Sequence, residues 1–118
     1  MEENRVTQQE YVSQVLDAYR KAPGTTGVVR RPDRLVAAQL YQRNVPLRAV
    51  GNALILGLAR RLYRPDGARP LGAIRSLAYF LPVIEEVLGL DISQDYFRYL
   101  YHRIKTHPRN QPGTPASE

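Results

Sequence analysis

The chain has 118 residues, of which 43% are hydrophobic and 24% charged, as expected for one globular domain with a modest core. The lack of cysteine and the presence of only two histidines exclude a disulfide framework, a thiolate zinc site and a histidine-rich metal site. The formal net charge is +6, and all but Lys21 and Lys105 of the 17 cationic residues are arginines, which bind phosphate and base edges better than lysine does.

The first helix is predicted over residues 8–21. Thr7 and Glu10 have the spacing of a capping box, and Pro23-Gly24 ends the pattern. The apolar residues between them recur on one helical face, formed by Tyr11, Val12, Val15, Leu16 and Tyr19. Residues 1–6, before this helix, are expected to be flexible.

A helix, a tight turn and a second helix are predicted over residues 33–43 and 46–63. Asn44 tolerates the left-handed conformation that ends a helix, and Pro46 suits the first position of the next one. In the helix of residues 33–43, the residues expected to point inward are Leu35, Val36, Leu40 and Tyr41. The second helix is apolar nearly all round, which predicts burial at the centre of the domain. Its glycines, Gly51 and Gly57, are expected to let a neighbouring helix approach closely.

Two further elements follow the turn-rich connector of residues 64–72. Residues 76–89 have a helical pattern interrupted by Pro82, which predicts a kink or two short helices. Ser93 and Asp95 open a last helix over residues 94–106. The residues predicted to line its inner face are Tyr96, Phe97, Leu100, Tyr101 and Ile104. We predict an all-α fold, a compact bundle of about five helices in a single domain of residues 7–106, followed by a disordered tail of residues 107–118.

The helix–turn–helix spacing of residues 33–63 has two interpretations. In DNA-binding proteins the second helix of such a unit enters the major groove, and arginine and asparagine then pair with guanine and adenine. The candidate residues around the turn are Arg43, Asn44, Arg48 and Asn52. A short helical hairpin is also a common structural connection in any all-α domain, and this helix becomes almost wholly apolar after Asn52.

Arginine clusters are the second candidate for a nucleic-acid site. One cluster is Arg30, Arg31 and Arg34, and the other is Arg60, Arg61 and Arg64, with Arg69 and Arg75 following. Such clusters suit phosphate contacts, which supply most non-specific affinity for nucleic acid. Structural roles are the alternative, because Arg60 and Arg61 suit a helix C-terminus and Arg75 could pair with Glu85, Glu86 or Asp91.

The last helix also carries aromatic and basic residues outside its predicted inner face. Tyr99, His102 and Arg103 have the composition of a surface on which single-stranded bases stack, although tyrosines at helical spacing also suit a core with a wet edge. Catalysis is not expected: Glu85 and Glu86 are adjacent and point in different directions, and no phosphate-binding glycine loop occurs. No metal and no cofactor are predicted.

Part of the chain resembles known proteins. The segments LYQRNVPLRAVGNAL, IRSLAYFLPVIEEVL and DYFRYLYHRI resemble small helical proteins encoded near replication and transposition genes of bacterial mobile elements. They are also similar to the DnaD-like helical domains of replication initiation, which end in an aromatic-basic helix and bind DNA. The resemblance covers about residues 33–105, without the tryptophan of the last DnaD-like helix. It implies a DNA-associated accessory protein without enzymatic activity.

Together these features predict a DNA-binding accessory or regulatory protein that contacts DNA, or RNA, mainly through arginine–phosphate contacts. The alternative is a helical adaptor, or a small subunit of a larger nucleoprotein assembly, and exposure of Tyr79, Phe80 or Tyr99 would favour it. The polar, acidic N-terminus and the lack of a long apolar run predict a cytoplasmic, bacterial protein without membrane contact.

Overall fold

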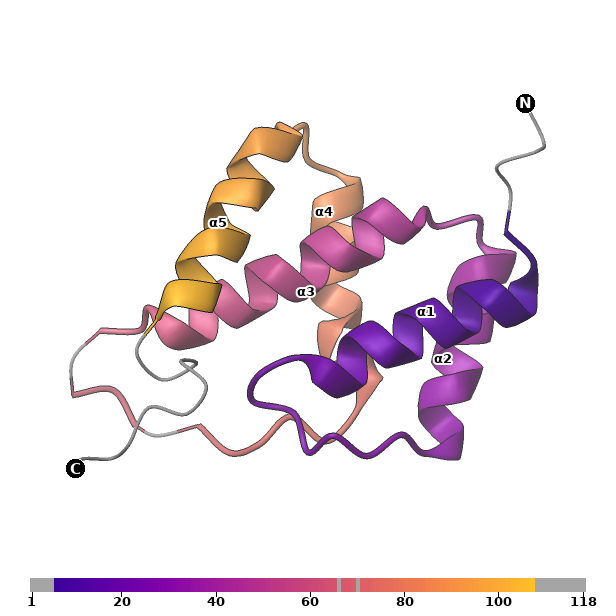
Figure 1. The fold of residues 1–118 in the computed structure, drawn as a ribbon, viewed down its shortest axis with the longest axis horizontal. Coiled ribbons are helices and arrows are strands. Elements are labelled where there is room, and N and C mark those ends of the chain that lie inside the picture. Colours follow the sequence, from indigo (N-terminus) through magenta and orange to yellow (C-terminus); the bar gives the residue numbers. More distant parts are fainter. Residues whose placement is uncertain (1–5, 66, 70, 108–118) are drawn as a thin grey trace.

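The computed structural model describes residues 6–65, 67–69 and 71–107, and the fold of its described part belongs to the all-α class (Figure 1). The elements in chain order are α1 (Gln8–Lys21), α2 (Arg31–Gln42), α3 (Leu47–Leu62), the 3₁₀-helix η2 (Leu77–Phe80), α4 (Leu81–Leu88) and α5 (Gln94–Thr106). The predicted all-α bundle of about five helices is therefore confirmed. The segments predicted to be flexible or disordered lie outside the described residues, apart from Val6 and His107.

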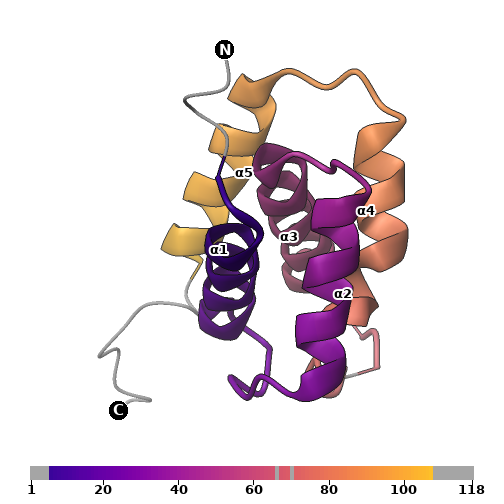
Figure 2. The same cartoon turned by 90° about the vertical axis from the view of Figure 1, so that its right-hand side faces the viewer.

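Helix α3 lies at the centre of the fold, as its apolar sequence predicts. Helices α1, α4 and α5 all pack against it, and in Figure 2 α3 lies between α5 on one side and α4 on the other. Helix α2 packs mainly against α1 and η2. No helix among the described residues has both the length and the hydropathy that a membrane span requires.

Local signals in the sequence account for the helix boundaries. The Thr7 hydroxyl accepts a hydrogen bond from the Glu10 amide at 3.1 Å, and the Glu10 carboxylate accepts one from the Thr7 amide at 2.9 Å, which completes the predicted capping box. Asn44 has a φ of 62° in the turn between α2 and α3, as expected. The Tyr11 hydroxyl donates to the Val45 carbonyl at 2.7 Å and so fixes this turn to α1.

The predictions of which residues face inward in α2 and in α5 are partly wrong. In α2 the buried residues are Asp33, Ala37 and Leu40, which form one stripe at i, i+4 and i+7. Leu35 lies about 200° around the helix from Asp33, and its side chain is 54% exposed. In α5 the buried stripe is Phe97, Leu100 and Ile104, so Tyr96 and Tyr101 flank it and are exposed.

The segment around Pro82 forms two short helices, as predicted. Helix η2 ends at Phe80 and α4 begins at Leu81, so Pro82 occupies the first turn of α4, where its missing amide costs no helical hydrogen bond. Gly57 of α3 permits the close approach of Phe80, because a Cβ at this position would lie 2.9 Å from the ring atom Cε1. Gly51 was also predicted to let a neighbouring helix approach closely, and this is wrong: no heavy atom of the described chain lies within 4 Å of a Cβ built at Gly51.

Candidate nucleic-acid interface

Two connecting loops, residues 22–30 and the connector between α3 and η2, come together along the lower edge of Figure 1, where Thr25 and Ile74 form a bridge. The Ile74 amide donates to the Gly24 carbonyl at 2.7 Å, and the Thr26 amide donates to the Ile74 carbonyl at 3.0 Å. Gly24 has a φ of 89°, a conformation that glycine adopts without strain. These bonds join segments that are about fifty residues apart in the sequence.

The buried carboxylate of Asp33 holds the same region together. One of its oxygens accepts from the Arg30 amide and caps α2, and the other accepts from the Leu77 amide at the start of η2, both at 2.8 Å. Asp33 is only 1% exposed, so both oxygens are bonded inside the protein. The two loops therefore end on helices that are fixed to each other, which limits how far the loops can separate.

The arginines carried by these two loops and by the helix ends next to them form what we call the basic edge: Arg30, Arg31, Arg61, Arg64, Arg69 and Arg75. Arg61 donates to the Gly72 carbonyl at 2.6 Å and to the Tyr79 hydroxyl at 3.2 Å, and Arg64 donates to the Arg69 carbonyl. These acceptors are neutral, so the bonds position the guanidinium groups without cancelling their charge. Asp66, in the same connector, lies outside the described residues.

The carboxylates of the described chain that form ion pairs do so with cations outside the basic edge. On α4, Glu85 pairs with Arg43 at 2.7 Å and Glu86 accepts from Arg60 at 2.8 Å. Hydrogen bonding to these arginines lowers the pKa of both glutamates below the ordinary value. The remaining pairs within the helices join Asp17 to Arg20 and Lys21, and Asp95 to Arg98.

Among the residues that the structure describes, no carboxylate forms an ion pair with an arginine of the basic edge. No ion pair among the described residues therefore offsets the positive charge of these six arginines. Arg60, predicted in the same cluster as Arg61 and Arg64, is instead bound to Glu86. Arg75 does not form the predicted pair with Glu85 or Glu86, whose partners are Arg43 and Arg60.

The candidate base-contacting residues around the turn between α2 and α3 do not belong to the basic edge. Arg48 and Asn44 are exposed, whereas Arg43 is held by Glu85. Asn52 is buried at 8% exposure, and its amide exchanges two hydrogen bonds of 3.2 Å with the side chain of Gln94. The Asn52 amide could hydrogen-bond to a base only if both of its bonds to Gln94 broke. Because α1, α4 and α5 cover α3, the hairpin does not present its second helix as a free reading helix.

The arginines at the two ends of α2 do not form one continuous face. Arg30, Arg31 and Arg34 lie at its start, whereas Arg43 follows its end and Arg48 belongs to α3. The 12 residues of α2 place Arg31 and Arg43 about 18 Å apart along the helix axis. Hydrogen bonds thus hold the loop that ends at Arg30 against the connector between α3 and η2, whereas α2 separates Arg30 and Arg31 from the turn at Asn44.

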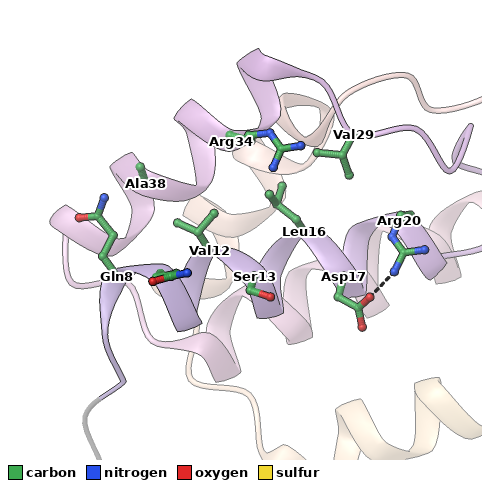
Figure 3. A pocket seen from close by; sticks show the side chains of 10 residues that line it. Gln8, Val12, Ser13, Leu16, Asp17, Arg20, Val29, Arg34 and Ala38 are labelled. Atoms are coloured by element: carbon green, nitrogen blue, oxygen red, sulfur yellow. Dashed lines mark hydrogen bonds and ion pairs between the residues drawn. The ribbon is translucent and has the colours of Figure 1, made fainter.

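Arg34 lies beside the basic edge, in an open groove of about 710 Å³ between α1 and α2 (Figure 3). Arg34 stands on the α2 side of this groove, and Arg20, bonded to Asp17, stands on the α1 side. Val12, Leu16 and Val29 supply apolar surface between them. A single carboxylate paired with arginine gives the groove no acid–base pair, so its arginines are better suited to binding an anion.

The aromatic and basic residues of α5 also lie on the surface. Tyr99 and Arg103 are exposed, and Tyr63, which follows α3, lies against Arg103. Tyr63 was not predicted as a site residue, because nothing local in the sequence shows that the end of α3 meets the end of α5. No cluster of metal-ligating side chains occurs among the described residues. Comparisons with protein-family models, curated proteins and solved structures give no match.

Proposed function

We propose that this chain binds nucleic acid, foremost DNA, through the basic edge and acts as an accessory or regulatory protein without catalysis of its own. The observation that carries this proposal is the pairing of two arginine-bearing loops on one side of the fold. In the described chain Arg61 and Arg64 bond to carbonyl and hydroxyl groups, and no arginine of the basic edge forms an ion pair with a carboxylate. A concentrated positive charge of this kind attracts a polyanion.

Phosphate groups are suitable partners for this edge. A guanidinium group binds phosphate through two parallel hydrogen bonds, and each contact releases counterions from the nucleic acid. Arg31, Arg69 and Arg75 have exposed side chains, while the bonds of Arg61 and Arg64 hold the connector in place. Binding of this type depends strongly on salt and weakly on sequence, because phosphate contacts carry no base information.

The proposal assigns no chemical step to the protein. The adjacent carboxylates Glu85 and Glu86 are bonded to arginines, and these bonds favour their ionised form. A carboxylate held in this way is a poor proton donor near neutral pH. The two glutamates therefore serve to fix α4 against the end of α2 and the end of α3.

A salt titration with two charge-matched variants tests the proposal. Binding of a labelled 20-base-pair duplex is measured by fluorescence anisotropy between 20 and 200 mM salt. The edge variant is Arg69→Ala with Arg75→Ala, and the matched control is Arg43→Ala with Arg48→Ala. Both variants remove the same charge from exposed positions. We expect the edge variant to weaken binding and to flatten the slope of log K against log salt by about 0.9 per lost phosphate contact.

The outcomes are distinct. Equal loss of affinity in the two variants would show that net charge, and not the basic edge, governs binding. A larger loss in the Arg43 and Arg48 variant would assign binding to the hairpin turn. Absence of binding at 20 mM salt, or affinity that does not change with salt, would refute the proposed function.

A helical adaptor remains the second candidate, because apolar side chains are exposed at the end of α4 and in the connection that leads to α5. Leu88 and Leu90 are 42% and 47% exposed, and Tyr79 on η2 is also exposed, although Phe80 is fully buried. An adaptor predicts a stoichiometric protein partner that survives nuclease treatment in a pull-down and is lost when Leu88 and Leu90 are replaced by serine. Loss of the partner on nuclease treatment would favour the nucleic-acid proposal.

A further inference from the structure

Exposed aromatic rings gather where the ends of α3 and α5 meet. A hollow of about 450 Å³ lies between the two helices. We call it the aromatic hollow, and it is lined by Leu56, Ala59, Arg60, Tyr63, Tyr96, Tyr99, Leu100 and Arg103. Its floor is aliphatic, and its walls combine tyrosine rings with guanidinium groups.

Arg103 is held between two of these rings. Its guanidinium carbon lies 5.0 Å from the centre of the Tyr63 ring and 5.7 Å from the centre of the Tyr99 ring. The guanidinium also donates to the Tyr99 hydroxyl at 2.7 Å, and the Tyr63 hydroxyl donates to the Arg103 carbonyl at 3.1 Å. Interaction with the hydroxyls of Tyr63 and Tyr99 raises the pKa of Arg103 above its ordinary value.

The three tyrosines that line the hollow are about half exposed. Tyr63, Tyr96 and Tyr99 are 44%, 45% and 52% exposed. Tyr96 and Tyr99 lie one turn apart on α5, with ring centres 6.4 Å apart and planes inclined by 32°. Tyrosines that only complete a core bury the ring and leave the hydroxyl in water. Half-exposed tyrosines instead present surface on which another flat group can stack.

We propose that the aromatic hollow binds an unstacked base of a single-stranded nucleic acid, so that this chain prefers single strands to duplexes. The inference rests on the proposed function and adds to it the class of nucleic acid. Bases in a duplex are stacked on one another and cannot enter a hollow of this kind, whereas the bases of a single strand stack readily on tyrosine and arginine.

The position of the hollow supports a continuous path for the strand. Tyr63 is followed directly by Arg64, the first residue of the connector that belongs to the basic edge. A strand with one base in the hollow can therefore place its next phosphate near Arg64. Glu86 is bonded to Arg60 at the margin of the hollow, so its carboxylate is already neutralised there.

The inference is tested with two tyrosines of the same helix. Tyr99→Leu removes a wall of the hollow, and Tyr101→Leu is the matched control, because Tyr101 is 51% exposed on α5 but does not line the hollow. The probes are a 12-nucleotide thymidine strand and a 12-base-pair duplex. We expect Tyr99→Leu to weaken binding of the single strand by roughly 5- to 150-fold, the effect of losing one stacked base, and to change duplex binding less than twofold.

A conservative variant separates stacking from the hydrogen bond to Arg103. Tyr99→Phe keeps the ring and removes the hydroxyl, so it should retain most of the affinity for the single strand. Tyrosine fluorescence provides a second readout, since the chain has no tryptophan and a base stacked on Tyr99 quenches the ring. Circular dichroism confirms that each variant remains folded.

Failure of this inference is distinguishable from failure of the proposed function. If Tyr99→Leu and Tyr101→Leu bind the single strand equally well, or if the duplex binds more tightly than the single strand, the stacking site is refuted. Salt-dependent duplex binding would then still support the basic edge. If neither probe binds at 20 mM salt, both proposals are wrong.

Discussion

Replacing either glycine of α3 by alanine tests how closely the central helix is packed. At Gly57 a Cβ atom would lie 2.9 and 3.1 Å from two atoms of the Phe80 ring, which is completely buried and has little room to move. At Gly51 no heavy atom of the described chain lies within 4 Å of the added atom. Both substitutions are made in the same helix, and only one of them meets a neighbour.

The magnitudes follow from two opposing effects. Alanine stabilises a helix interior relative to glycine by about 0.8–1 kcal/mol, and this gain is common to both variants. Overpacking a buried ring costs about 1–3 kcal/mol and applies only at Gly57. We expect Gly51→Ala to raise the free energy of unfolding by about 0.5–1 kcal/mol. We expect the free energy of unfolding of Gly57→Ala to be about 1–3 kcal/mol lower than that of Gly51→Ala, because the helix-propensity gain is common to both variants and cancels in the comparison.

Urea unfolding followed by far-ultraviolet circular dichroism measures both values. The two variants should share the denaturant slope of the parent chain and differ in midpoint. Equal stabilisation by the two alanines would refute the packing described for α3, because the Phe80 ring would then have to move away at no cost.

Three further predictions concern the fold around the proposed sites. Asp33→Ala removes a helix cap and leaves a buried amide unsatisfied, so the free energy of unfolding measured in urea should fall by about 2–4 kcal/mol. A fall of less than about 0.5 kcal/mol would contradict the role of Asp33. Leu54→Ala should cost about 2–5 kcal/mol in the same assay, whereas Leu35→Ala, on the exposed side of α2, should cost under about 0.5 kcal/mol. The pKa of Glu86 is lowered by Arg60, so its contribution to stability is present above the ordinary glutamate pKa of about 4.3 and is lost as pH falls through the lowered value. Glu86→Gln should therefore flatten the fall in thermal midpoint below about pH 4.3, and an unchanged acid profile would contradict the pairing.

The fold was largely predictable because its boundaries depend on local chemistry. The capping box at Thr7 and the Ser93 cap set the first and last helices at the residues expected from the sequence. The inner faces were less predictable, because the period of a pattern does not show which part of an amphipathic helix meets its neighbours. Leu35 was expected inside and is exposed, since α2 rests on α1 and η2 through a different stripe.

The candidate site was only partly predictable for the same reason. The arginine clusters are visible in the sequence, but their partners depend on distant segments. Arg43 and Arg60 meet glutamates because α4 lies across α3, and nothing near these arginines in the sequence indicates that arrangement. The bonds between Gly24 and Ile74, which bring the two loops together, are likewise a consequence of the complete fold.

The most direct test of the basic edge is to map where nucleic acid touches the protein. We propose to record nitrogen–proton NMR spectra of the full chain while adding a 12-nucleotide strand at low salt. The basic edge predicts the largest amide shifts in residues 24–31 and 63–75, with the shifts reversing as salt is raised. Shifts confined to the hairpin turn of residues 43–48 or to the exposed leucines between α4 and α5, or no shifts at all, would contradict it.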